Sequence, residues 1–358
     1  MNPPIPPFAL IRTDAVAATA TGHAMRCLAL AEALQEHGSE SRFLMTGVPA
    51  LIAERFAREG FAIERQPHAI GSAEDAAATA QTAHRHGADW VVLDGYMFDD
   101  AYLETLRQAE LRVLLIDDLG ALRRYRCDLL VNQNLHADAA LYPEAGARLL
   151  LGTRYLMLRR EFWRHRDAGR RPAETVKRIL VSMGGLDPEN NASRAIAALD
   201  GLAGLGIAAN VVVGAANPRL EALREQVSAS RAEIAIVHGT DDMPGLMREA
   251  DLAVAAGGTT AWEVAFMGVP MLLGSTAEGE RMLARRLSRE GGCIYLGDFR
   301  DCPASRLRDA ILGLVADAGM RRRIAAVASA LVDGRGGERV VAAMRNHGSL
   351  AQETGHAA

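Results

Sequence analysis

The amino-acid sequence predicts an α/β protein made of two doubly wound domains, each built on a parallel sheet. Three observations support this prediction. The chain has 358 residues, about twice the usual size of one domain. Short runs of Val, Ile and Leu alternate with longer Ala-rich segments almost from end to end, a pattern typical of parallel sheets with helices on both faces. Hydrophobic residues make up 49% of the chain, enough to fill two cores.

The first half contains six predicted strands, each a short apolar run bounded by polar or Gly-containing segments. A helix is expected at His23–Glu36, because Met25, Leu28 and Ala33 fall on one face at helical spacing. The predicted strands are Phe8–Arg12, Arg42–Met45, Phe61–Arg65, Trp90–Leu93, Val113–Ile116 and Asp128–Val131.

A second βα series follows a break in the pattern. The break is the charged, Gly- and Pro-containing stretch Arg164–Pro172, which is a candidate linker. We therefore expect one domain over residues 1–165, a second over 175–346, and a flexible tail at 347–358. The strands predicted in the second domain are Ile179–Met183, Asn210–Val213, Ile234–Val237, Leu252–Ala255, Met271–Leu273 and Ile294–Leu296.

Charge and composition exclude several classes of protein. The net charge of −4 argues against a nucleic-acid-binding protein, which usually carries a strongly basic face. No apolar run approaches the length of a membrane helix, so no membrane insertion is expected. The four cysteines form no CxxC pair and indicate reduced thiols, which together with the lack of a signal peptide favours a cytoplasmic protein. Lysine chemistry would depend on the single lysine, Lys177.

The first candidate site is the loop after the first strand, which leads into a helix near His23. Ligands bind at the carboxyl ends of strands in this class of fold. The positive end of the helix would keep the His23 imidazole neutral, as a general base requires. The alternative is that His23 only caps the helix. Asp14 and Arg26 flank the loop, although charged residues at loop edges are usually just solvated.

The second candidate site is a Gly-rich corner where a buried strand meets a helix. Gly257 and Gly258 would let the backbone approach a diphosphate, and Thr259 and Thr260 add hydroxyl donors. Glu263, one turn into the helix, would accept hydrogen bonds from a ribose diol. The alternative is an ordinary corner whose glycines only permit tight packing. A weaker third candidate is the Gly184-Gly185 turn after the first strand of the second domain.

The motifs that the chain lacks also narrow its chemistry. It has no Asp-x-Asp triplet, HExxH, HxxEH, GxxxxGK[ST], GxGxxG or GxSxG motif. Metal-dependent sugar transfer, P-loop, dinucleotide and serine-hydrolase chemistry therefore lose support, and no metal or cofactor is expected. Asp117 and Asp118 are adjacent on an extended chain and should point in opposite directions.

These residues match a known family. The segment TGHAMRCLALAEAL at 21–34 resembles the GHxMRCxxLAxxL signature of the UDP-sugar hydrolases of pseudaminic acid biosynthesis. That family cleaves UDP from UDP-2,4-diacetamido-2,4,6-trideoxy-β-L-altropyranose. Further matches occur in order along most of the chain: LDGY at 93–96, LLIDDLG at 114–120, CDLLVNQN at 127–134, LLGTRYLMLRREF at 150–162, ILVSMGGLDP at 179–188, ADLAVAAGGTTAWEVAFMGVP at 250–270 and VDGRGGERV at 332–340.

The resemblance implies a GT-B-like fold, in which two Rossmann-like domains face each other across a cleft. It also implies metal-free, inverting C–O cleavage that releases UDP and a free sugar, with His23 as the catalytic residue that activates water. The substrate-binding residues would be Arg12, Asp14, Gly22, Arg26 and Tyr96. The nucleotide-binding residues would be Gly184, Gly185, Gly257, Gly258, Thr259, Thr260 and Glu263.

The chain departs from the family pattern in two places. In the loop before the helix, Val16 and Ala20 replace a serine and a glycine. In the second domain, Gly279 and Glu280 replace an Asn-Gln pair. Two other functions therefore stay open: a GT-B glycosyltransferase that uses an acceptor alcohol, and a nucleotide-sugar-binding protein without catalysis.

Overall fold

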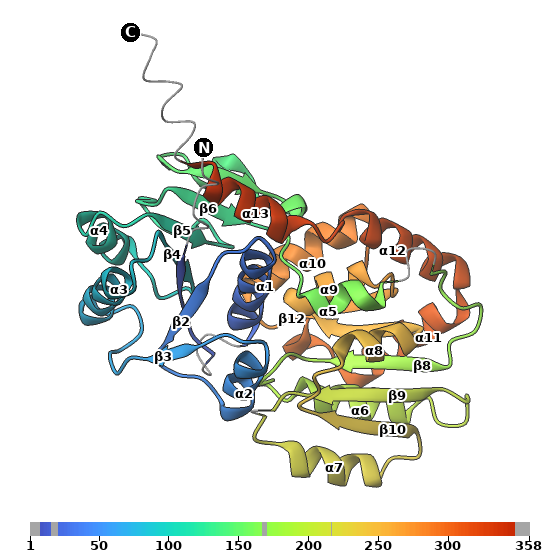
Figure 1. The fold of residues 1–358 in the computed structure, drawn as a ribbon. Helices are drawn as coiled ribbons and strands as arrows, with labels where there is room; N and C mark the ends of the chain where they lie inside the picture. The colour runs from blue at the N-terminus through green and yellow to red at the C-terminus, as the bar shows by residue number, and fades with distance from the viewer. Residues whose placement is uncertain (1–7, 16–20, 167–169, 216, 348–358) are drawn as a thin grey trace. The chain divides into compact units, whose positions relative to one another are not determined.

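The computed structural model describes residues 8–15, 21–166, 170–215 and 217–347, and it divides into two compact units (Figure 1). The first unit contains the residues up to Arg160 and those from Gly334 onward. The second unit contains Glu161–Asp333. Each unit has one parallel sheet with helices packed against it, which confirms the predicted fold class.

The first unit is built on a seven-stranded parallel sheet with the order β3-β2-β1-β4-β5-β6-β7. The chain runs outward from β1 in one direction and from β4 in the other, so the topological switch point lies between β1 and β4. Ligands bind at such points in open α/β sheets. The strands are β1 (Ala9–Thr13), β2 (Ser41–Met45), β3 (Ile63–Arg65), β4 (Trp90–Asp94), β5 (Val113–Ile116), β6 (Leu129–Asn132) and β7 (Arg148–Leu151).

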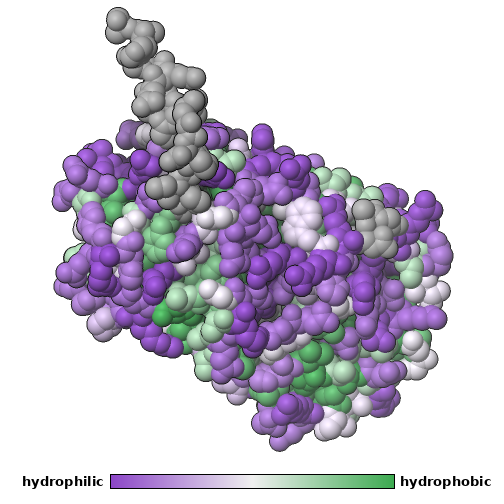
Figure 2. Space-filling view, viewed as in Figure 1, coloured by the Kyte–Doolittle hydropathy of each residue, from purple (hydrophilic) through white to green (hydrophobic). Residues whose placement is uncertain are grey.

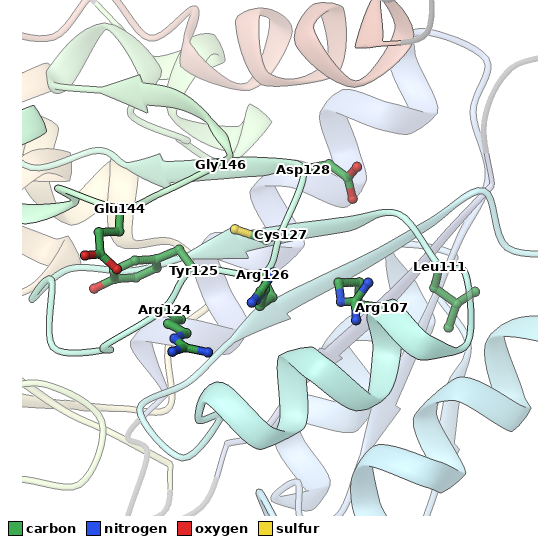
Figure 3. A pocket seen from close by; sticks show the side chains of 9 residues that line it. All are labelled: Arg107, Leu111, Arg124, Tyr125, Arg126, Cys127, Asp128, Glu144 and Gly146. Carbon is green, nitrogen blue, oxygen red and sulfur yellow. The ribbon is translucent and has the colours of Figure 1, made fainter.

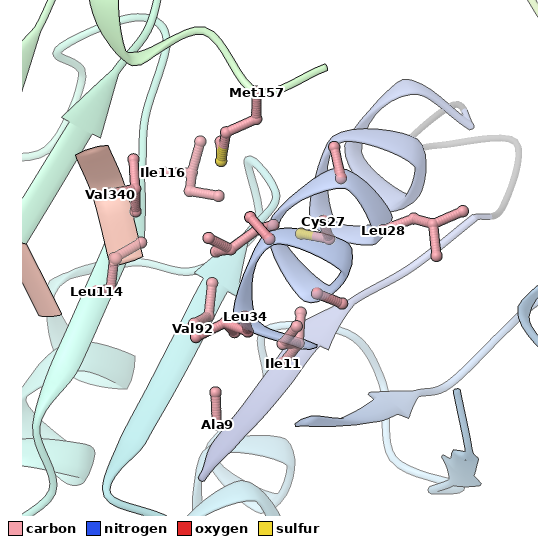
Figure 4. Packing of buried hydrophobic residues seen from close by; sticks show 14 of the residues in the cluster. Ala9, Ile11, Cys27, Leu28, Leu34, Val92, Leu114, Ile116, Met157 and Val340 are labelled. Atoms are coloured by element: carbon pink, nitrogen blue, oxygen red, sulfur yellow. The ribbon is translucent and has the colours of Figure 1, made fainter. Parts of the chain in front are cut away.

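Both faces of this sheet are buried. On one face, Ile11 of β1 and Val92 of β4 belong to the same cluster as Cys27 and Leu28 (Figure 4). A separate hydrophobic cluster, which includes Leu103 of α4 (Asp100–Gln108), covers the other face. The helical elements are α1 (Gly22–Glu36), α2 (Ala50–Arg58), α3 (Ala73–His86), α4 (Asp100–Gln108), η1 (Ala139–Leu141), η2 (Thr153–Tyr155) and α13 (Gly336–Arg345).

The second unit repeats this architecture with six parallel strands in the order β10-β9-β8-β11-β12-β13. Its switch point lies between β8 and β11. The strands are β8 (Arg178–Ser182), β9 (Ala208–Val213), β10 (Glu233–His238), β11 (Leu252–Ala256), β12 (Met271–Ser275) and β13 (Ile294–Asp298).

The helices of the second unit follow its strands in alternation. Helix α5 (Arg160–His165) lies at the boundary between the units. The others are α6 (Asn191–Asp200), α7 (Leu220–Ser228), α8 (Met243–Glu249), α9 (Thr259–Phe266), α10 (Glu278–Glu290), η3 (Phe299–Asp301), α11 (Ala304–Ala316) and α12 (Ala318–Ala330).

All twelve predicted strands are present, with ends within two residues of the predicted ones. One further strand, β7, was not predicted; it has four residues and lies at the edge of its sheet. Its exposed and half-buried positions weaken the apolar pattern on which strand prediction depends.

One helix lies in a different unit from the one expected. Residues 336–345 were assigned to the second domain, but α13 belongs to the first unit. The reason is its apolar face, because Val340, Val341 and Met344 are buried in the core cluster that contains α1. Of the predicted linker, residues 167–169 lie outside the described residues, as do residues 348–358 of the predicted tail.

The surface is mixed in polarity. Figure 2 shows hydrophilic residues over most of the visible face, interrupted by smaller apolar patches. Within the described residues, no helix is both long enough and apolar enough to cross a membrane.

The start of α13 gives a direct test of its packing. A Cβ atom on Gly336 would lie 2.2 Å from the carbonyl oxygen of Leu156 and 2.4 Å from its nitrogen. Because backbone atoms cannot yield cheaply, we expect Gly336→Ala to lower the free energy of unfolding by about 1–3 kcal/mol, as measured by urea denaturation.

The control is Gly313→Ala, within α11. This glycine is exposed, and nothing lies within 4 Å of its Cβ position. It should leave stability unchanged or raise it by about 0.5–1 kcal/mol through helix propensity. Equal stability of the two variants would contradict the packing assigned to α13.

Candidate active site

Polar side chains gather at the carboxyl edge of the first unit's sheet. Asp94 ends β4, Asp118 follows β5 by two residues, and Asn134 follows β6 by two. His23 lies in the first turn of α1, the helix that follows β1. All four side chains are buried. His23 therefore lies in the helix that follows β1 and Asp94 ends β4, and these two strands flank the switch point.

His23 is held by Asp94. The His23 Nδ1 atom lies 2.6 Å from Asp94 Oδ1. Burial raises the pKa of Asp94, but the charges of Arg26 and His23 outweigh this effect and lower it to about 2. Asp94 is therefore a carboxylate, which only accepts hydrogen bonds, so Nδ1 must carry the proton that it donates.

This arrangement leaves His23 Nε2 as the nitrogen that can accept a proton when the ring is neutral. The described residues place no hydrogen-bond partner on Nε2. The residue before α1, Thr21, makes no side-chain cap. Among the described residues, His23 Nδ1 bonds to Asp94, and an Arg26 terminal nitrogen lies 3.1 Å from the same ring atom. His23 is thus oriented as a base would be, and its side chain does not cap the helix.

Arg26 connects two buried carboxylates. Its Nε donates to Asp94 Oδ2 at 2.6 Å, and one terminal nitrogen donates to both oxygens of Asp118 at 2.8 and 2.9 Å. Burial lowers the pKa of Arg26, but Asp118 and Asp94 outweigh it, so the pKa lies well above its usual value. All three guanidinium nitrogens contact protein groups. The structure thus gives Arg26 the role of holding Asp94 and Asp118.

Tyr96 is the exposed member of this group. Its ring is 54% exposed and meets the His23 ring edge-on, with centroids 4.8 Å apart. Its hydroxyl donates to Asp118 Oδ2 at 3.4 Å, and Asn134 Nδ2 donates to Asp118 Oδ1 at 2.6 Å. Tyr96 is therefore placed to contact a ligand that reaches His23.

Asp94, Asp118 and Asn134 were not predicted as site residues. Asp94 directly precedes Gly95-Tyr96 at a strand end, which was an available signal. Asp117 and Asp118 do act separately, since Asp117 accepts hydrogen bonds from the backbone nitrogens of Leu119 and Gly120.

Two of the expected substrate-binding residues, Arg12 and Asp14, are buried and bonded to other protein groups. Arg12 is fully buried and donates to both oxygens of Asp75 at 2.9 and 2.8 Å. Asp14 pairs with Arg12 and accepts from the backbone nitrogens of Thr46 and Gly47 at 2.7 and 3.0 Å. These contacts tie the end of β1 to the loop after β2. A direct contact of Arg12 with substrate gains no support from them.

Part of the predicted loop lies outside the described residues. Val16 and Ala20, where the chain departs from the family pattern, belong to that part. Gly22 is the first residue of α1 and lies one position before His23.

In the second unit, the two Gly-Gly turns follow neighbouring strands. Gly184-Gly185 follows β8 and Gly257-Gly258 follows β11, and these strands pair at the switch point. Gly184 adopts a left-handed φ of +84°, a conformation that favours glycine. A Cβ atom on Gly257 would lie 2.8 Å from the carbonyl oxygen of Glu280. Tight packing therefore explains Gly257 at least in part.

The two helices after these turns differ at their amino ends. The Asp187 carboxylate accepts from the nitrogens of Asn191 and Ala192 at 2.7 and 2.8 Å, so the start of α6 is already capped. Helix α9 has Gly258 at its N-cap and no side-chain cap. Its first-turn N–H groups and positive dipole end favour an anion.

The side chains around this corner are polar. Thr259 and Thr260 form the first turn of α9 and are partly exposed, and Glu263 lies one turn further and is 8% exposed. Together with the Gly257-Gly258 turn, they provide donors for phosphate oxygens and a carboxylate for hydroxyl groups.

Other features of the described residues are separate from these sites. A pocket at the opposite edge of the first unit's sheet is lined by Arg107, Arg124, Arg126, Cys127 and Asp128, among others (Figure 3), and contains none of the predicted site residues. No group of three or more His, Cys, Asp or Glu side chains in the described part of the chain could hold a metal ion.

Comparison with known proteins supports the fold and shows distant sequence relatives. No family model matches the chain. It is 26% identical over 242 residues to the spore coat polysaccharide biosynthesis protein SpsG of Bacillus subtilis, covering 67% of this chain and 70% of that protein.

Solved structures with the GT-B fold match almost the whole chain. The Staphylococcus aureus MnaA structure with UDP superposes with a TM-score of 0.70 at 14% identity, covering 96% of this chain and 97% of that one. Acinetobacter baumannii MurG gives a TM-score of 0.64 at 17% identity, covering 95% and 100%. The chain therefore has the GT-B fold and is distantly related to SpsG.

The charge network predicts a stability effect that depends on pH. Replacing Arg26 with Gln leaves Asp94 and Asp118 buried without a cation, which should cost about 3–5 kcal/mol at pH 7. The folded-state pKa of Asp94 lies below its ordinary 3.8, so in the wild type ionised Asp94 stabilises the fold above about pH 4, and this contribution is lost as the pH falls toward 2. Without Arg26 the carboxylates protonate more readily, so the cost should shrink at pH 3.5.

Denaturation at both pH values measures this difference. The matched control is Arg85→Gln, which removes a half-exposed arginine paired with Glu64 and should cost about 0–1 kcal/mol. If both variants lose the same stability at pH 7, the buried network does not have the strength assigned to it.

Proposed function

We propose that this protein hydrolyses a UDP-activated 2,4-diacetamido-2,4,6-trideoxyhexose to UDP and the free sugar. The observation that carries the proposal is the His23–Asp94 pair at the switch point of the first sheet, with Nδ1 bound and Nε2 left to act. The product would enter the synthesis of pseudaminic acid or a related nonulosonate, for modification of flagellin or surface glycan. The relative SpsG is named for polysaccharide biosynthesis, which agrees with such a role.

In this reaction His23 is the general base. Water donates a proton to Nε2 while its oxygen bonds to C1 of the sugar, on the face opposite the leaving group, so the configuration at C1 inverts. Asp94 keeps the ring in the required orientation and stabilises the imidazolium that forms. Tyr96, exposed beside His23, would contact the sugar, and Gly22 and Arg26 would support the loop and the dyad.

The leaving group is UDP, and the second unit offers the groups to bind it. The C1–O bond breaks with its electron pair going to the β-phosphate oxygen. The uncapped start of α9, with Gly257, Gly258, Thr259 and Thr260, would stabilise this developing negative charge without a metal. Glu263 would accept from the ribose hydroxyls. Gly184-Gly185, on the neighbouring strand end, would line the same nucleotide site.

The direct test is incubation of the purified protein with the UDP-diacetamido sugar in ¹⁸O-labelled water. We expect release of UDP, unchanged by EDTA, with the label on C1 of the sugar and none on the phosphate. Label on phosphate would contradict C–O cleavage. The absence of UDP release under varied conditions would exclude the hydrolase. Turnover only when an acceptor alcohol is added would instead identify a glycosyltransferase.

The roles of His23 and Asp94 predict distinct kinetics. His23→Ala should abolish hydrolysis while UDP binding persists, because the base is lost and the second unit is unaltered. Asp94→Asn should lower kcat by about 10²- to 10⁴-fold, because the ring loses the partner that fixes its orientation. Steady-state assay of UDP release measures both.

Asp117→Asn is the matched control, since the Asp117 side chain lies at the same sheet edge and is bound, among the described residues, by the backbone nitrogens of Leu119 and Gly120 and by Tyr125. Its kcat should stay close to that of the wild type. Full activity of His23→Ala would rule out the proposed base. UDP binding by a wild-type protein that turns over no sugar would indicate a non-catalytic binding protein.

A further inference from the structure

Glu280 lies inside the corner proposed to bind the UDP diphosphate. It is the third residue of α10 and is partly buried. Its carbonyl oxygen lies 2.8 Å from the Cβ position of Gly257, and its carboxyl oxygen Oε1 lies 3.4 Å from the Cβ position of Gly258. Gly258 is the N-cap of α9, so a carboxyl group lies beside the helix end where an anion is expected.

The two carboxyl oxygens of Glu280 have different surroundings. Oε2 accepts from the backbone nitrogen of Thr276 at 2.7 Å and from its hydroxyl at 2.9 Å. A glutamate at the third position of a helix commonly accepts from the backbone at the amino end; here Thr276, one residue before the N-cap Ala277, supplies the donors. That accounts for Oε2, whereas Oε1 is directed toward Gly258. A glutamine could perform the same capping without the charge.

Among the described residues, the charged and titratable groups around Glu280 provide no cation that would offset the negative charge of a diphosphate bound beside an ionised Glu280. Burial raises the pKa of Glu280 against the hydrogen bonds from Thr276 and Ala277, and the charge of Asp298, at the end of β13, adds to the rise. Arg281, on the same helix, is shared between Glu278 and Asp298. Two other titratable side chains belong to the elements around Glu280, and neither is a cation. Tyr295 of β13 bonds to Ser275, and Glu263 is the ionisable side chain of α9.

We propose that Glu280 is a specificity-determining residue of the nucleotide site, and that it binds a diphosphate only in its protonated form, with Oε1–H donating to a phosphate oxygen. This inference rests on the proposed function, because it takes the α9 corner as the diphosphate site. The proton comes from solvent, so each UDP-sugar that binds above the titration range of free Glu280 brings one proton with it. Affinity then falls by about tenfold for each pH unit above that range.

The test is calorimetric titration with UDP-N-acetylglucosamine between pH 5.5 and 8.5, using the full chain. This probe shares uridine and diphosphate with the proposed substrate, and its diphosphate does not titrate in this range. At each pH, two buffers of different ionisation enthalpy report the proton uptake. For the wild type we expect a rise in Kd of at least tenfold across the range, with proton uptake at the alkaline end.

Glu280→Gln should bind with nearly constant Kd and no proton uptake, because the amide keeps both the cap and a donor. Glu278→Gln is the matched control: it removes a carboxylate from the same helical turn, where the side chain is 57% exposed, and should keep the wild-type profile. An identical pH profile in the wild type and Glu280→Gln would overturn the inference and leave the nucleotide site intact. Failure of both proteins to bind the probe at any pH would overturn the nucleotide site itself.

Discussion

The first unit depends on the compensation of buried charge around Asp94. This carboxylate binds both His23 and Arg26, and Arg26 in turn binds Asp118, which is also held by Asn134. The network joins side chains that follow four adjacent strands, β1, β4, β5 and β6. Because ionised groups inside a protein are stable only when paired, each member constrains the others. The orientation of His23 is the outcome of that constraint.

The two units present different electrostatics at their switch points. The first has a closed set of ion pairs that leaves one imidazole nitrogen unbound by the described residues. The second has an uncapped helix end lined with glycine and threonine, and a carboxyl group beside it. The proposed chemistry divides in the same way, since activation of water needs an oriented base, whereas departure of UDP needs fixed dipoles. Glu280 is the ionisable group that we propose makes the nucleotide site of the second unit sensitive to pH.

Much of the fold could be predicted from the sequence, because apolar periodicity reports strands and helices directly. The Gly257–Thr260 corner and the His23 helix were likewise visible as strand-to-helix transitions. Contacts between side chains far apart in the sequence could not be predicted in this way. His23 and Asp94 are 71 residues apart, and only the order of strands in the sheet brings them together. Arg12 illustrates the converse, since the family resemblance implied a substrate contact but tertiary packing buries it against Asp75. The place of α13 depended on the same kind of distant packing.

Asp94 fixes the His23 tautomer with Nδ1 protonated, which leaves Nε2 free to accept a proton. The ¹⁵N chemical shifts of the His23 imidazole, recorded at a pH where the ring is neutral, report that tautomer directly. We expect a protonated Nδ1 and an unprotonated Nε2 in the wild type, with this preference weakened in Asp94→Asn. A wild-type ring protonated on Nε2 would contradict it, because that nitrogen could not then take a proton from water.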